Sequence, residues 1–262
     1  MMNKKIVNGL CLALTLGPFS AFAEKTITLS YENVDSYPFA MVDGSGIDLI
    51  LLKMVDEALP EVAFKYETTP WQRCLHNIET AVSEGCFTAS FKEERLKHGF
   101  YPGTQAGGAV DPALRLHASS YSLYVPAGSN IEVSEKLSIT NLKGKIAVPT
   151  GYSIGDDLAK AGYAVDEQSA KTHSNFKKLL AGRVDAVAAL TLNGDNILEK
   201  DASLKGKIVK VETPLVDKPY YLMFSKQFYS ANPELAEKIW NTAAQLRESP
   251  EFADAAGAFL AK

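Results

Sequence analysis

The stretch GIDLILLKMVDEALPEVAFKY (residues 46–66) decides the first part of the fold. Its apolar residues recur at helical spacing as far as Leu59, and Pro60 then stops the helix. The next segment, residues 62–66, alternates apolar and polar side chains as a half-buried strand does. The stretch therefore predicts a helix that leads directly into a strand.

Similar segments flank this stretch on both sides. A short strand is expected at residues 27–31, before the helix. After it, PWQRCLHNIETAVSEG (residues 70–85) opens at a proline and predicts a second helix, and CFTAS (residues 86–90) predicts the next strand. The order β-α-β-α-β predicts a parallel sheet with helices packed on it.

The rest of the chain predicts a second group of strands and helices and then a return to the first. We expect a first lobe that begins at residues 24–118, a second lobe at residues 119–217, and a return with terminal helices at residues 218–262. The chain would cross between them near residues 117–123 and 216–221. Ligands of open α/β sheets bind beyond the carboxyl ends of the strands, so a two-lobed α/β protein would close on a ligand by hinge motion.

Residues 1–23 have the pattern of a signal peptide that is removed on export. Lys4 and Lys5 precede an apolar run, and Ala21-Phe22-Ala23 has the small residues of a cleavage site. A membrane anchor is the alternative, but it needs about 20 apolar residues, and this run is shorter. We therefore expect an exported protein.

Composition argues against several classes of function. A formal net charge of −4 over 262 residues does not favour nucleic acid, which binds clustered Lys and Arg. The four histidines are scattered without metal-ligand spacing, and each is expected to be a surface or structural residue. No nucleophile–base pair or phosphate loop is present in the sequence, so neither a cofactor nor an enzymatic activity is expected.

Two cysteines, Cys74 and Cys86, remain after removal of the leader. A close pair in an oxidising compartment favours a disulfide. The alternative is two buried thiols, because the spacing between a helix and the next strand often exceeds disulfide reach. The sequence leaves both interpretations open.

In the order of its segments the sequence resembles the bacterial extracellular solute-binding proteins of the amino-acid type (family 3), the receptors of ABC importers. The resemblance is carried by YPF and GIDLILLKMVDEAL, PW before a helix, TASFKEER and GFYP, LKGKIAVPTGYS, LLAGRVDAV and a terminal helix pair. It implies the type II periplasmic binding protein fold and a periplasmic location. It also implies a small-molecule ligand, a membrane permease as partner and a monomeric state.

The resemblance also implies the residues of a ligand site. Arg95 falls on the family's anchor for a ligand carboxylate, and a guanidinium suits this role because it binds a carboxylate through two parallel hydrogen bonds. Ser90 and Thr88 fall on strand-end positions near the same carboxylate. The alternative for Arg95 is a surface ion pair with Glu93 or Glu94.

Further candidates come from the second lobe and from aromatic positions. Gly151, Tyr152 and Ser153 match a glycine turn at a helix start, where free backbone N–H groups can bind an anion. Tyr37 and Trp71 lie near positions where the family places an aromatic ring against the ligand, with core packing as the alternative. Two residues beyond Trp71, Arg73 would either add a second cation to the cleft or lie in solvent.

One position departs from the family pattern. The acid that usually binds a ligand ammonium falls on or near Leu190, and a leucine cannot pair with an ammonium. Either the ligand has no ammonium, or another residue replaces the acid. The candidate substitutes are Glu32, Asn33, Thr191, Asn193 and Asp195.

Two other functions stay open beside import. A sensory receptor of the same fold would dock a membrane sensor instead of a permease, and nothing in the sequence separates the two. A dehydratase-like enzyme on this scaffold is the third alternative, since a fold does not fix a function.

Overall fold

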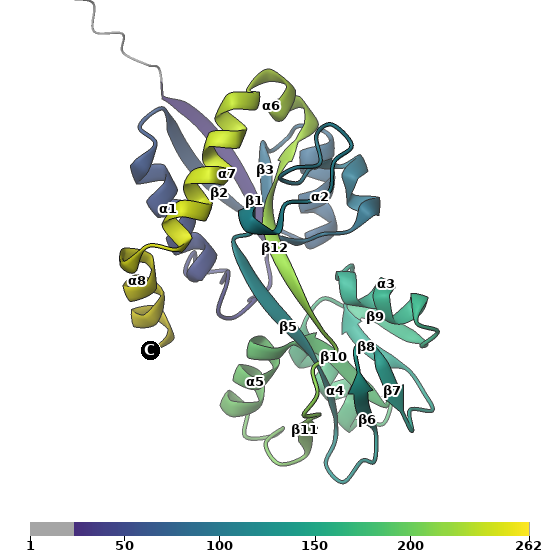
Figure 1. Ribbon diagram of the computed structural model, residues 1–262. Helices are drawn as coiled ribbons and strands as arrows, with labels where there is room; N and C mark the ends of the chain where they lie inside the picture. The colour runs from purple at the N-terminus through teal and green to yellow at the C-terminus, as the bar shows by residue number, and fades with distance from the viewer. Residues whose placement is uncertain (1–23, 262) are drawn as a thin grey trace, which may run out of the picture.

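The computed structural model describes residues 24–261, so the expected signal peptide lies outside the described residues. These residues form two lobes joined by two long strands (Figure 1). The joining strands, β5 (His117–Pro126) and β12 (Val216–Ser225), pair antiparallel and run from one lobe into the other. No helix within residues 24–261 is long and apolar enough to span a membrane.

The expected β-α-β-α-β order of the first lobe is confirmed. Its elements are β1 (Lys25–Glu32), α1 (Ile47–Ala58), β2 (Val62–Thr69), α2 (Trp71–Glu79) and β3 (Gly85–Ser90). The strands lie in the order β2-β1-β3 and are parallel. Their carboxyl ends, which include Glu32 and Ser90, therefore lie at one edge of the sheet.

The sheet as a whole is mixed rather than parallel. Strand β12 lies between β3 and β5 and is antiparallel to both. A two-residue strand, β4 (Gly99–Phe100), also pairs with β12. The sequence pattern predicted the parallel part correctly, but β12 comes from the end of the chain and no local pattern reveals its place. The chain ends in α6 (Lys226–Ala231), α7 (Pro233–Arg247) and α8 (Pro250–Leu260).

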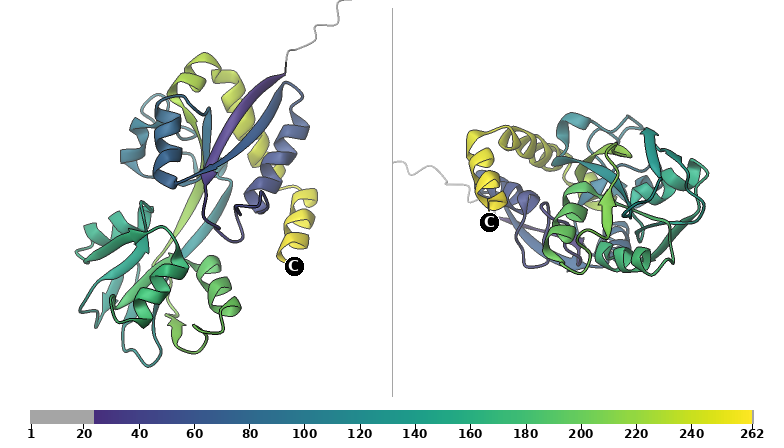
Figure 2. Two further views of the ribbon diagram at one scale, coloured as in Figure 1. Left: turned by 180° about the vertical axis from the view of Figure 1, so that it is seen from behind. Right: turned by 90° about the horizontal axis from the view of Figure 1, so that it is seen from below.

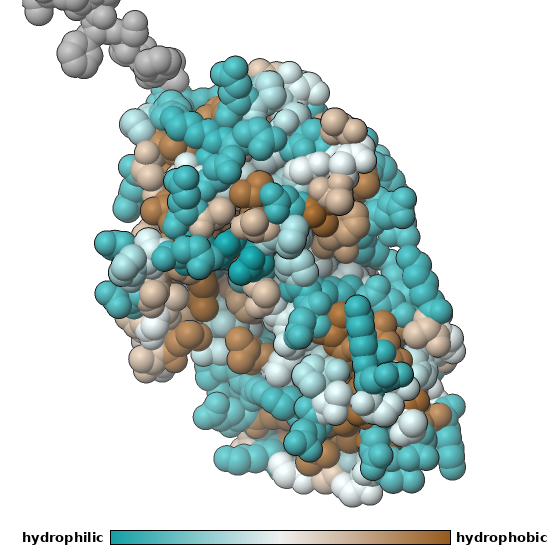
Figure 3. All heavy atoms as spheres, viewed as in Figure 1, coloured by the Kyte–Doolittle hydropathy of each residue, from teal (hydrophilic) through white to brown (hydrophobic). Residues whose placement is uncertain are grey.

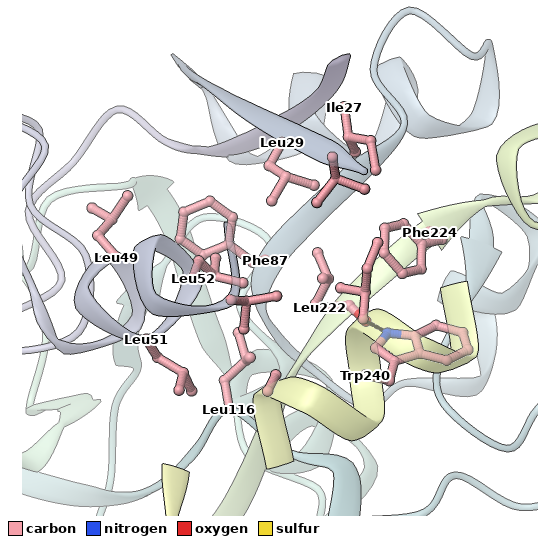
Figure 4. Packing of buried hydrophobic residues seen from close by; sticks show 14 of the residues in the cluster. Ile27, Leu29, Leu49, Leu51, Leu52, Phe87, Leu116, Leu222, Phe224 and Trp240 are labelled. Carbon is pink, nitrogen blue, oxygen red and sulfur yellow. Dashed lines mark hydrogen bonds between the residues drawn. The ribbon is translucent and has the colours of Figure 1, made fainter. Parts of the chain in front are cut away.

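Alternation along the strands divides the first lobe into two apolar layers. Phe87, Leu222 and Phe224 face α1 and α7, where Trp240 packs and donates a 2.8 Å hydrogen bond to the Leu222 carbonyl (Figure 4). The neighbouring residues of β3 and β12 belong to the layer that covers α2 on the opposite face. Figures 1 and 2 show α1 and α7 on one side of the sheet and α2 on the other.

The second lobe continues the same sheet beyond β5. The strands that follow are β10 (Ala186–Leu190), β8 (Ile146–Pro149) and β9 (Val165–Ser169), with β11 (Ile208–Lys210) against β5. Its helices are α3 (Ser153–Lys160), α4 (Thr172–Leu180) and α5 (Thr191–Lys200), and β6 (Glu132–Glu135) and β7 (Ser138–Thr140) form a separate hairpin. The sequence did not predict β9, α5 or the hairpin. Short 3₁₀ segments are η1 (Glu93–Lys97) and η2 (Pro112–Leu114).

Of the two alternatives for the cysteines, the structure shows the buried thiols and not the disulfide. Cys74 on α2 and Cys86 on β3 are both free and fully buried. The hydrogen bond between Cys74 and the Cys86 thiol, together with burial, raises the pKa of the Cys74 thiol. Both thiols are fully buried, so a reagent in solution does not reach them in the folded protein.

We expect that Ellman's reagent will titrate neither thiol in the native chain of residues 24–262 and both after unfolding in denaturant without reductant. The expectation follows from the burial of Cys74 and Cys86 as free thiols. A sample reduced before unfolding is the control. No reaction in the unfolded, unreduced sample would mean that the two residues are bridged in solution.

Candidate functional site

A small cavity lies where the two lobes meet. Its free volume of about 20 Å³ is enough for a water-sized group. The carboxyl ends of β1, β3 and β10 reach it, as do the starts of α2 and α3 and both joining strands. Its walls are formed by Glu32, Ser36, Trp71, Thr88, Ser90, Arg95, His117, Tyr121, Tyr152, Ser153, Leu190 and Tyr220.

Arg95 is buried, with only 4% of its surface exposed. Its guanidinium donates a 2.6 Å hydrogen bond to the Ser90 carbonyl in the first lobe and a 3.0 Å hydrogen bond to the Gly151 carbonyl in the second. The guanidinium also lies over the ring of Trp71, 4.9 Å from its centroid, where the ring face attracts a cation. The expected alternative, an ion pair on the surface, is wrong.

Further contacts join the lobes around this cation. The hydroxyls of Ser90 and Ser153 are 2.8 Å apart, and the Tyr152 hydroxyl donates a 2.6 Å hydrogen bond to Glu32 Oε2. At the rim, Lys92 forms an ion pair with Asp156 of α3. The surface is accordingly continuous between the lobes on the side of α3 (Figure 3). The described conformation is closed.

A β-bulge positions the two hydroxyl residues of β3. The pairing of β3 with β12 shifts between Tyr221 and Met223, and Thr88 has a φ of 56°, which is uncommon for a β-branched residue. The kink places Thr88 beside Ser90 in the cavity wall. Strain of this kind persists where the surrounding structure fixes it, and it is concentrated at functional sites.

Gly151 lets the two lobes approach closely. Its φ of 74° lies in the left-handed region, and an added Cβ would lie 3.3 Å from Trp71 Cδ1 and would overlap the side chain of Gln72. Tyr152 and Ser153 follow at the start of α3 and line the cavity. The glycine turn thus lies directly against the first lobe.

Glu32 is the only carboxylate in the cavity wall. Burial raises the pKa of Glu32 to about 7, although the hydrogen bond from Tyr152 and the charge of Arg95 act in the opposite direction. Near neutral pH the side chain is therefore divided between a carboxylate and a neutral acid. It can accept a proton or donate a hydrogen bond within the physiological range.

The position of the missing acid lies in the cavity, and it is filled by Leu190. Of the candidate substitutes, only Glu32 lines the same cavity. Thr191 instead bonds to the Ser122 hydroxyl, and Asp195 accepts from Tyr124 and pairs with Lys210. Asn193 lines a second, more open cavity of about 540 Å³.

Three other sequence candidates lie outside the cavity around Arg95. Arg73 is exposed on α2, so it does not supply a second cation. Tyr37 and Asn33 line the larger neighbouring cavity, where the Lys200 ammonium lies 5.5 Å from the Tyr37 ring centroid. Arg73 faces away because the buried residues of α2 are Trp71, Cys74, Leu75 and Ile78, which define its inner side.

The sequence analysis missed four residues of the cavity wall, which are Ser36, His117, Tyr121 and Tyr220. His117 is buried beside the cavity and pairs with Asp48, as expected of a structural histidine, and its Nε2 has no partner among residues 24–261. The signal available in the sequence was the position of His117, Tyr121 and Tyr220 at the two expected crossovers. No group of three side chains in residues 24–261 is arranged to hold a metal ion.

Comparison with known structures identifies the fold as that of the two-lobed periplasmic binding proteins. A variant of ArgBP from T. maritima has a TM-score of 0.70 and 18% identity, covering 90% of this chain and 96% of that chain. GshT, from work on glutathione import in Streptococcus mutans, has a TM-score of 0.71 and 18% identity, with 91% and 95% covered. A histidine kinase sensor domain similar to periplasmic binding proteins has a TM-score of 0.71 and 15% identity, with 90% and 96% covered.

These neighbours are binding proteins and a sensor domain, and they include amino-acid-binding proteins of the type that the sequence resembles. No family model matches the sequence, and no curated protein matches it either. At this level of identity the likeness establishes the fold, as the resemblance implied. The ligand has to be argued from the cavity itself.

We expect the stability of the protein to fall as the pH rises from 5 to 8, in part through Glu32. Because its pKa is raised from 4.5 to about 7, the native state holds this proton more tightly than the unfolded chain, and that stabilisation is lost as the pH rises through about 7. The effect has an upper limit on the order of 3 kcal/mol, since opening of the cleft also relieves the burial. Melting temperatures of the wild type and Glu32→Gln across this range measure it.

In Glu32→Gln the melting temperature should fall by several degrees less between pH 5 and pH 8 than it does in the wild type. The exposed Glu57→Gln on α1 is the matched control, because it removes the same group from the surface. Profiles of identical shape for the wild type and Glu32→Gln would contradict the raised pKa of Glu32.

Proposed function

We propose that this protein is a periplasmic solute-binding protein that captures a small carboxylate-bearing ligand between its lobes and delivers it to an ABC importer. The observation that carries the proposal is the buried guanidinium of Arg95 in the interlobe cavity. A cation held out of water in a cleft favours an anionic ligand.

The cavity gives a carboxylate more than one partner. Arg95 has five N–H donors, and each of its two terminal nitrogens already donates to a carbonyl that fixes the orientation of the group. The Ser90 and Ser153 hydroxyls adjoin it, and Ser153 opens α3, whose N-terminal N–H groups carry a partial positive charge. These groups suit a carboxylate better than a neutral ligand.

Hinge closure is the mechanism that the architecture supports. The lobes are joined by β5 and β12, and the contacts between lobes are hydrogen bonds and ion pairs that opening of the cleft can break. A ligand that bridges Arg95 and the start of α3 would bind the closed form better than the open one. Its binding energy would shift the population toward closure.

A sensory role is the second candidate function. The histidine kinase sensor domain matches this chain at a TM-score of 0.71, as well as the importer-related protein does. In that role the closed protein would dock a membrane sensor instead of a permease. Co-purification of the ligand-loaded protein with each membrane component distinguishes the two roles.

Removal of Arg95 should abolish tight binding. A thermal-shift screen of amino acids, their deaminated acids, dicarboxylates, polyamines and small peptides identifies the ligand, since a compound at a hundred times its Kd stabilises by about 2.7 kcal/mol. Arg95→Ala should then weaken binding of that compound by at least about 2 kcal/mol, which is roughly 30-fold. Isothermal titration calorimetry measures the change.

Two further variants make the result specific. Arg73→Ala removes an exposed arginine from the neighbouring helix and should leave affinity unchanged. Arg95→Lys retains the charge but cannot form two parallel hydrogen bonds with a carboxylate. Its loss of ligand affinity should therefore lie between those of Arg95→Ala and Arg73→Ala. Unchanged affinity in Arg95→Ala would exclude Arg95 from the site, and a screen in which no compound binds would overturn the proposed function.

A further inference from the structure

His117 occupies the point where the chain leaves the first lobe. It is the first residue of β5 and lies opposite Tyr220 of β12 in the antiparallel pair that joins the lobes. Only 8% of its surface is exposed, and it lines the same cavity as Arg95.

Two aromatic rings and one carboxylate pack around the His117 ring. Phe39 stacks on one face with ring centroids 3.5 Å apart, and Tyr220 stacks on His117 with centroids 4.7 Å apart. Its Nδ1 lies 2.7 Å from Oδ1 of Asp48. The remaining edge carries Nε2, which is buried without a partner, so this edge is the one that faces the cavity.

A buried carboxylate and two aromatic rings surround the His117 ring. Asp48 is fully buried, and His117 is the only side chain among residues 24–261 with which it forms a hydrogen bond or ion pair. A buried carboxylate requires a compensating charge, and the faces of aromatic rings attract cations. With Nδ1 directed at Asp48, Nε2 is the ring nitrogen that is left for a ligand.

The same loop fixes Asp48 and Phe39. The Asp48 backbone N–H donates a 2.9 Å hydrogen bond to the Phe39 carbonyl. Gly46, with a φ of 126°, lies so close to that carbonyl that a Cβ would overlap it. The carboxylate and the stacking ring are therefore held in one rigid arrangement around His117.

Trp71 adds a second unpaired donor. Its indole Nε1–H is buried without a partner, and the residue is 6% exposed in the cavity wall. Together with Arg95 and His117, the cavity thus presents a guanidinium, an imidazole edge and an indole N–H. The one acid beside them is Glu32, whose pKa burial raises to about 7. This set of groups has an excess of donors and positive charge.

We propose that His117, held by Asp48, is a second anion-binding residue of the site, and that the ligand is a short-chain dicarboxylate. One carboxylate would bind Arg95, and the other would accept hydrogen bonds from His117 Nε2–H and Trp71 Nε1–H. The inference rests on the proposed binding function and names its ligand class. Asp48 acts as a positioning residue. In the described closed conformation the cavity holds only a water-sized group, so the ligand would enter with the lobes apart.

Calorimetric titration with matched probes tests this assignment. Succinate, butyrate and 4-aminobutyrate share a four-carbon chain and one carboxylate, and they differ in whether the other end is a carboxylate, a methyl or an ammonium group. The corresponding three- and five-carbon series cover chain length. At pH 6, where Glu32 is mostly protonated, we expect one dicarboxylate to bind at least about 30-fold more tightly than its two partners.

The variants assign that preference to His117. His117→Phe keeps the aromatic stack and should reduce the preference for the dicarboxylate to less than about 3-fold. Asp48→Asn should reduce the preference in part. His117→Phe leaves the buried Asp48 without its partner and could fail to fold for that reason. The double variant Asp48→Asn/His117→Phe removes the acid as well and is then used for the same measurement. His76→Phe, on the exposed side of α2, is the control and should behave as the wild type.

The outcomes separate this inference from the proposed function. Equal or better binding of a monocarboxylate or an amino acid by the wild type would overturn the dicarboxylate assignment and leave the binding function intact. A dicarboxylate preference that survives in the His117 variants would overturn the role of His117 alone. Absence of binding by every probe and by the wider screen would overturn the binding function.

Discussion

The burial of the Arg95 guanidinium is the constraint on which the closed structure depends. A buried cation is costly unless its donors have acceptors, and the acceptors of Arg95 come from both lobes. The Ser90 carbonyl belongs to β3, whereas the Gly151 carbonyl belongs to the turn before α3. Tyr101 also donates to the Ser90 carbonyl and holds it in place at 2.7 Å. The position of the second lobe is thus coupled to the solvation of one side chain.

The joining strands carry part of the site as well as the hinge. Tyr121 on β5 and Tyr220 on β12 are joined through their hydroxyls at 2.9 Å, and both line the cavity. Lys218, two residues before Tyr220, donates to the Ser153 hydroxyl at 2.9 Å and pairs with Asp157 of α3. A change in the twist of the two strands would therefore move cavity groups directly. Residues that line the cavity thus lie on the strands that join the lobes.

Local patterns predicted the elements of the first lobe, because α1, β1, β2 and β3 each have clear periodicity. Periodicity could also have placed Arg73 outside, since the apolar residues of α2 define its inner side. The pairing of His117 with Asp48 was beyond reach, because it joins residues 69 positions apart through packing that no local pattern encodes. The resemblance drew attention to Leu190, and the structure shows that Glu32 is the one carboxylate among the described residues that line the cavity.

Leucine at position 190 changes the electrostatics of the cavity as well as its shape. An ionised acid at the end of β10 would compensate part of the Arg95 charge and repel a second carboxylate. With Leu190 in that place, the compensation inside the cavity depends on Glu32, and burial favours the neutral form of that residue. The same desolvation that weakens Glu32 as an anion strengthens every remaining attraction between the cavity donors and an anionic ligand. A leucine at this position and the burial of Glu32 thus act in the same direction, toward an excess of positive charge in the cavity.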